Sequence, residues 1–91
     1  MIRIQETFPE ENAAAIGVDG RLDQESLQTL KDVCLRHLKK KRKITLHLEG
    51  LSHIDKEATG FLKEIRKEIT LEGIPEFLKL EIEDSKKNDL S

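Results

Sequence analysis

The chain has 91 residues, of which 36% are hydrophobic and 37% charged, with 16 basic against 18 acidic side chains. This length has room for one small hydrophobic core and excludes a deep cleft between two domains. A net charge of −2, with three phenylalanines and no tryptophan or tyrosine, argues against nucleic acid as a partner. No apolar run approaches the roughly 20 residues that span a bilayer, and the N-terminus does not resemble a secretory signal. We therefore expect a cytoplasmic protein with no direct membrane insertion.

Alternating apolar and polar residues predict two strands at the start of the chain. Ile2 and Ile4 alternate with polar neighbours over residues 1–6, and residues 8–12 form the expected turn. A second alternation over 14–18 ends at the turn signal Asp19-Gly20. The two segments are expected to form an opening pair of strands.

A helix is predicted from Asp23 to about Lys40. The Asp23 carboxylate can accept hydrogen bonds from the free backbone N–H groups of the first turn, as an N-cap does. The helical spacing of apolar residues is carried by Leu27, Leu30, Cys34 and Leu38. His37 is expected on the solvent side, and the basic run 39–43 at the carbonyl end of the helix is interpreted as a solvated helix end.

A short third strand over 44–48 is expected to end at Glu49-Gly50, and Asp55 is expected to cap a second helix. The apolar face of that helix consists of Ala58, Phe61, Leu62, Ile65 and Ile69. Gly73 and Pro75 would end it.

The segment 74–83 fits two structures. The alternation of Leu78, Leu80 and Ile82 favours a fourth strand at 77–82, whereas a helix opened by Pro75 would leave residues 69–71 to supply that strand. With the strand preferred, the pattern predicts an α/β domain over 1–83, with a mixed sheet of about four strands and helices packed against it, followed by a polar tail at 84–91.

No residue pattern indicates catalysis or a cofactor. The three histidines lack a second ligand at metal-binding spacing, and the single cysteine, Cys34, lies on an apolar helix stripe where a thiolate is disfavoured. Gly17 and Gly20 do not belong to a phosphate-binding loop. We expect no metal, no cofactor and no enzymatic activity.

Two stretches together resemble the STAS domain, the module of bacterial anti-sigma-factor antagonists and of the cytoplasmic ends of sulfate transporters. The first stretch runs from Ala14 to Asp23 and the second from Ile44 to Asp55. The resemblance covers residues 2–82 and implies a bacterial regulatory module of transcription or signalling that binds a protein. The implied partner is an anti-sigma factor or a related switch kinase.

The chain departs from the phosphorylatable members of this family at the start of the second helix. In those members the Asp is followed by Ser-Ser-Gly or Ser-Thr-Gly, and the second hydroxyl residue is phosphorylated. Here the segment is Asp55-Lys56-Glu57-Ala58-Thr59-Gly60, so that Glu57 occupies the phosphoacceptor position. Glu57 either mimics a phosphoserine in part or only complements the helix dipole, and an alignment shifted by two residues would instead make Thr59 the acceptor. A second departure is that the chain is short at the C-terminus, where family members commonly continue with further elements.

The resemblance places the partner surface on the loop 49–55 and on residues 55–62. The expected contact residues are Ser52, His53, Asp55, Lys56, Glu57, Thr59 and Gly60, with Asp23 and Asp55 as structural caps. Within the same fold, the alternative is a small STAS subunit docked on a membrane transport ATPase. From a different class, the alternative is a ligand binder or enzyme that uses the anionic rim of Asp55, Glu57 and Glu49.

Overall fold

A computed structural model describes residues 2–82 of the chain. Its elements are β1 (Ile2–Glu10), β2 (Ala13–Leu22), α1 (Gln24–Lys39), β3 (Lys43–Ile54), α2 (Lys56–Ile65) and β4 (Thr70–Glu72), followed by a helical segment at 76–82. The strands form one sheet in the order β1-β2-β3-β4, in which β1 is antiparallel to β2 and the other pairs are parallel. The predicted α/β fold with a mixed four-stranded sheet is therefore confirmed.

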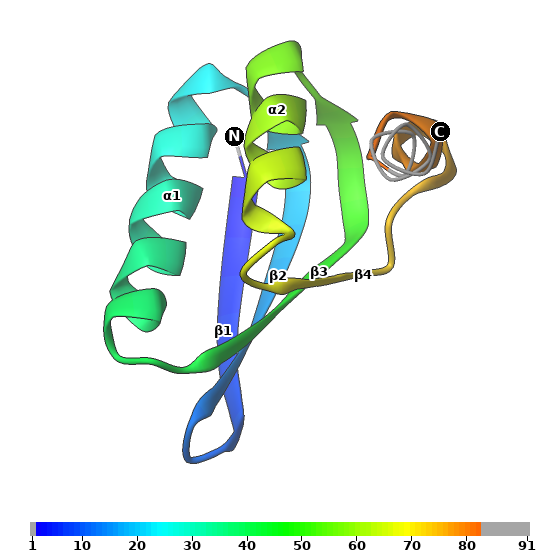
Figure 1. The fold of residues 1–91 in the computed structure, drawn as a ribbon. Helices are drawn as coiled ribbons and strands as arrows, with labels where there is room; N and C mark the ends of the chain where they lie inside the picture. Colours follow the sequence, from blue (N-terminus) through cyan, green and yellow to red (C-terminus); the bar gives the residue numbers. More distant parts are fainter. Residues whose placement is uncertain (1, 83–91) are drawn as a thin grey trace.

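The helices lie on one face of the sheet, where α1 and α2 pack side by side (Figure 1). Over residues 14–18 of β2 and 44–48 of β3, every second side chain is buried against this face, among them Ile16, Val18, Leu46 and Leu48. The intervening residues are small or polar and partly exposed. This alternation is the pattern of a sheet with one face against the core and the other toward solvent. None of the described helices is long and apolar enough to cross a membrane.

The first hairpin is longer than the sequence predicts. Strand β1 continues through Phe8 and Pro9, so that only residues 11 and 12 form the turn. Proline, which has no backbone N–H, is tolerated here because β1 is an edge strand and pairs on one side only. The pairing with β2 shifts register between Thr7 and Glu10, and this irregularity accommodates the proline. The expected turn at 8–12 was therefore wrong in extent.

Strand β3 also runs past its expected end. Residues 49–54, which were expected to form a loop, continue the strand with register shifts against β2 on either side of Asp19-Gly20. Gly50 permits this because the Asp19 carboxylate lies where a β-carbon on residue 50 would stand. The Glu49-Gly50 pair is thus an irregularity within a strand and not a turn.

The C-terminal part follows the second of the two expected structures, so the preferred strand at 77–82 was wrong. Residues 76–82 are helical, and the carbonyl of Pro75 accepts the first hydrogen bonds, from the N–H groups of Leu78 (2.9 Å) and Lys79 (3.1 Å). Leu78 and Ile82 are fully buried whereas Leu80 is 78% exposed, which is the spacing of a helix and not of a strand.

Helix α2 correspondingly ends at Ile65, earlier than expected, and a turn leads to β4. Ile69 is still buried, because its N–H bonds to the carbonyl of Ile65 at 3.0 Å and so continues the helical phase for one more turn. Beyond β4, Gly73 has a φ of 66°, a left-handed conformation that suits glycine, and the Glu49 side chain lies against it. The polar tail expected at 84–91 lies outside the described residues.

Candidate protein-binding surface

Both long helices begin at the same end of the molecule, where the parallel strands β2 and β3 finish (Figure 1). Asp23 occupies the N-cap of α1, and its Oδ1 accepts from the N–H of Ser26 at 3.0 Å. This backbone hydrogen bond is the main reason that the pKa of Asp23 lies below its usual value of 3.8. Asp55 occupies the N-cap of α2 in the same way, with Oδ1 3.0 Å from the N–H of Ala58.

The ends of β2 and β3 are held together by two further hydrogen bonds. The hydroxyl of Ser52 donates to the carbonyl of Gly20 at 3.2 Å, and the N–H of Asp55 donates to the carbonyl of Leu22 at 3.2 Å. Gly20 has a φ of 100°, which a residue with a side chain rarely adopts. Ser52 and His53 are exposed at the end of β3 and are fixed in place directly before α2.

The first turns of α2 expose some residues to solvent and bury others. Lys56, Glu57 and Gly60 are exposed, whereas Ala58 is fully buried in the core. Glu57 lies in the first turn, where the N-terminal end of the helix dipole favours a carboxylate. Within residues 2–82, no side chain forms an ion pair with Glu57, so its charge faces solvent.

Thr59 does not present its hydroxyl to solvent. The residue is only 7% exposed, and its Oγ1 donates to the carbonyl of Asp55 at 3.0 Å. A hydroxyl that bonds to the carbonyl four residues earlier is a common arrangement for a helical threonine. Thr59 therefore contributes to this surface as part of the lining of a hollow, described next, and not as an exposed group.

That hollow has a volume of about 290 Å³ and lies between α2 and the helical segment 76–82. It is lined by Ile54, Asp55, Lys56, Thr59, Gly60, Lys63 and Glu81. Of the expected contact residues it gathers Asp55, Lys56, Thr59 and Gly60, while Ser52, His53 and Glu57 lie outside it. Lys63 was missed although it lies seven residues after Lys56 and so on the same helix face. Glu81 could not be found while residues 77–82 were assigned to a strand.

The histidines and the cysteine occupy separate places. His37 is buried, contrary to the expected solvent position, because it follows Val33 and Cys34 by one helical turn and so lies on the buried stripe of α1. His47 is partly exposed near Glu49, with 3.7 Å between Nδ1 and Oε1. Burial raises the pKa of Cys34 to about 11. Among the described residues, no three His, Cys, Asp or Glu side chains gather closely enough to hold a metal ion.

Solved structures share this fold, and two of them are described here. The anti-sigma factor antagonist SpoIIAA in its unphosphorylated form matches with a TM-score of 0.67 and 16% identity, over 97% of this chain and 96% of its own. A protein of the DUF3478 family from Shewanella loihica PV-4, described as having a SpoIIAA-like fold, matches with a TM-score of 0.59 and 14% identity, over 96% of this chain and 79% of its own. No curated protein matches the chain in sequence. The STAS domain family model matches residues 6–79, and the chain belongs to the STAS domain family.

Proposed function

We propose that the chain is a non-enzymatic, cytoplasmic regulatory module that binds a protein partner, as an anti-sigma-factor antagonist does, and that it is held in one binding state. The surface we assign to the partner comprises the end of β3 and the first turns of α2, with Ser52, His53, Lys56, Glu57 and Gly60 at its exposed positions. Membership of the STAS family and the fold shared with SpoIIAA support a protein-binding role. The proposed partner is an anti-sigma factor or a related switch kinase.

The observation that carries the proposal is the placement of Glu57. In the ungapped comparison with phosphorylatable STAS domains, Glu57 occupies the position of their acceptor hydroxyl residue. It carries a permanent, exposed negative charge in the first turn of α2, two residues after the N-cap. A carboxylate has about half the charge of a phosphoserine and fewer acceptor oxygens, so the resemblance to the phosphorylated state is partial.

The burial of Thr59 supports the absence of a switch. If the alignment were shifted by two residues, Thr59 would be the acceptor, yet its hydroxyl is buried and donates to the carbonyl of Asp55. The hydroxyl is therefore already engaged within the first turn of α2. Under the shifted alignment, the buried residues Ala58 and Leu62 would no longer coincide with the apolar positions of the family's helix.

The test is affinity capture from native lysate with the wild-type chain and with Glu57→Ala, quantified by mass spectrometry. Glu64→Ala is the matched control, because Glu64 is an exposed glutamate on α2 seven residues later, about two turns or roughly 10 Å along the helix. We expect Glu57→Ala to change the yield of the main partner while Glu64→Ala leaves it unchanged. Equal yields from all three proteins would overturn the role of Glu57. A membrane transport ATPase as the main partner would instead support the alternative of a transporter subunit.

A further inference from the structure

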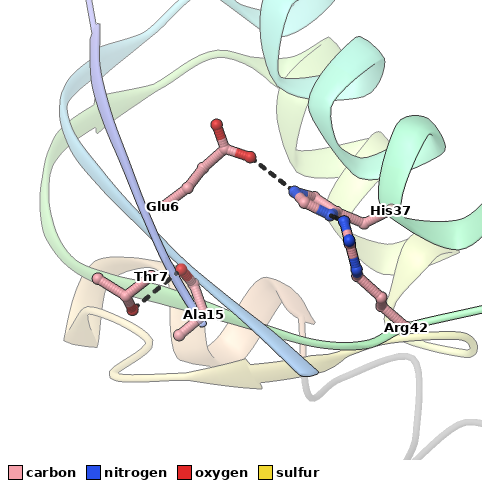
Figure 2. Close-up of polar contacts among 5 residues, drawn as sticks. All are labelled: Glu6, Thr7, Ala15, His37 and Arg42. Carbon is pink, nitrogen blue, oxygen red and sulfur yellow. Dashed lines mark hydrogen bonds and ion pairs between the residues drawn. The ribbon is translucent and has the colours of Figure 1, made fainter. Parts of the chain in front are cut away.

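A partly buried polar cluster lies at the opposite end of the molecule from the partner surface, where α1 ends beside the β1–β2 hairpin. Its centre is His37, which is 2% exposed. The Nε2 atom of the ring lies 2.6 Å from Oε1 of Glu6, and Nδ1 lies 3.1 Å from Nη1 of Arg42 (Figure 2). One imidazole ring thus bridges a carboxylate on β1 and a guanidinium in the connection between α1 and β3.

The partners of the ring fix where its proton resides. A guanidinium has only donors, so Nδ1 of His37 must accept from Arg42 and cannot carry a proton in this arrangement. The proton of the neutral ring therefore resides on Nε2, which donates to the Glu6 carboxylate. The two contacts together fit an imidazole that donates from Nε2 to Glu6 and accepts at Nδ1 from Arg42.

The backbone places Arg42 in this position. Lys41 has a left-handed conformation, with a φ of 56°, and its N–H donates to the carbonyl of Leu38 at 2.9 Å. The N–H of Arg42 donates to the carbonyl of His37 at 3.2 Å, which completes a Schellman-type helix end. The Arg42 guanidinium then covers the ring of Phe8 at 5.2 Å, while Phe8 meets His37 edge-on with 5.8 Å between ring centroids.

We propose that this cluster is a proton-operated latch between the hairpin and the end of α1. When His37 takes up a proton from solvent at Nδ1, the ring becomes a cation with two donors and can no longer accept from Arg42. Two like charges would then stand about 3.1 Å apart in a partly buried place, which is unfavourable. The latch opens when Arg42 leaves the ring.

The charges around the ring determine which of its two contacts is lost on protonation. Glu6 from β1 and Arg42 from the α1–β3 connection face the imidazole, and within residues 2–82 no other charged side chain forms a hydrogen bond or ion pair with it. Protonation converts the bond to Glu6 into an ion pair and makes the contact with Arg42 repulsive. The two effects oppose each other, so the hairpin stays attached through Glu6 while Arg42 is released.

Release of Arg42 changes the surface at this end of the molecule. Phe8 is already 55% exposed and loses the guanidinium that covers its ring. Arg42 belongs to the basic run 39–43, and its guanidinium becomes free to move while the charge of the run stays the same. Protonation of His37 therefore uncovers the ring of Phe8 beside the basic run 39–43.

The test is NMR spectroscopy of the full chain between pH 8 and 5, following the imidazole nitrogens, the Phe8 ring protons and the side-chain N–H of Arg42. We expect the Nε2–H tautomer of His37 at pH 8, and Phe8 and Arg42 signals that move in step with His37 protonation. His37→Gln should abolish this movement, whereas His47→Gln, at a histidine outside the cluster, should leave it unchanged.

Three results would overturn the latch. The first is the Nδ1–H tautomer in the wild type at pH 8. The second is Phe8 and Arg42 signals that stay fixed while His37 titrates. The third is the same movement in His37→Gln as in the wild type. The first two need no variant, so the proposal stays open to refutation even where His37→Gln does not fold.

Discussion

The replacement Leu78→Ala tests whether the segment 76–82 is a helix packed on the core. Leu78 is fully buried, so its truncation removes apolar contacts worth about 0.8 kcal/mol for each buried methylene-sized group and leaves a cavity. The expected loss in the free energy of unfolding is about 2–5 kcal/mol, a large share of the roughly 5–15 kcal/mol that stabilises a small domain. Leu80 is 78% exposed, so Leu80→Ala should change stability by no more than about 0.5 kcal/mol.

Urea denaturation followed by circular dichroism measures both losses. With a slope of about 1–3 kcal/mol per molar for a small domain, a loss of about 3 kcal/mol lowers the midpoint by roughly 1–3 M. A strand at 77–82 would place Leu78 and Leu80 on the same face and make the two replacements similar. Equal shifts for the two variants would therefore refute the helical packing of this segment, as would a negligible shift for Leu78→Ala.

Three further predictions concern the helix caps and the buried thiol. Asp55→Ala should lower the free energy of unfolding by about 0.5–2 kcal/mol in urea titrations, whereas Asp55→Asn, which keeps an acceptor oxygen, should lose much less; equal losses would argue against capping. Because the pKa of Asp23 is lowered in the folded state, its contribution to stability is fully present above about pH 4 and is lost as the pH falls through the lower folded value. Thermal melting between pH 5 and 2 should therefore show a smaller loss of stability for Asp23→Asn than for the wild type. Identical melting profiles would contradict this. Cys34, whose pKa is raised to about 11, should react with iodoacetamide at pH 8 only after unfolding in urea; rapid labelling of the folded chain would contradict its burial.

The strand-strand-helix order of the first half could be predicted from the sequence because its signals agree with one another. The element ends could not, since the turn is confined to residues 11 and 12 and β2 continues through the expected turn Asp19-Gly20 to Leu22. Strand β2 alternates cleanly up to Val18, and Asp23 provides an N-cap directly before a helical apolar stripe. Each of these signals is local, and each is supported by the packing of the helix on the sheet.

The position of His37 could not be predicted in the same way. The expected stripe of α1 led from Cys34 to Leu38, whereas the buried face also includes Val33 and continues from it to position 37. The burial of a histidine depends in addition on Glu6 and Arg42, and such distant partners are not apparent in a local pattern.

The second half could not be settled from local patterns. Leu78, Leu80 and Ile82 alternate, but Leu78 and Ile82 are also four residues apart, so a strand and a helix are both consistent with the sequence. Only packing on the core distinguishes them, because it buries two of these side chains and leaves Leu80 exposed. The turn expected at Glu49-Gly50 was wrong for a related reason. The pair lies inside β3 at an irregularity in its pairing with β2, and that pairing depends on tertiary structure.

The candidate surface was partly predictable. The N-cap of α2 and the exposed Glu57 follow from local sequence, because a cap and a first-turn carboxylate are recognised by spacing alone. The burial of Thr59 and the hollow shared with Glu81 depend on how α2 packs against the core and the segment 76–82. These features came only from the structure.

The most direct test of the central claim is to add ATP and Mg²⁺ to the complex of the chain with its captured partner, and to record the intact mass of the chain and the fraction that stays bound. A fixed charge at Glu57 and a buried hydroxyl at Thr59 predict no added phosphate on the wild-type chain and an unchanged bound fraction. Glu57→Ser restores an exposed hydroxyl and is the variant expected to accept a phosphate where the partner is a kinase. Phosphate on Ser52 or Thr59 of the wild-type chain, together with release of the partner, would contradict the account.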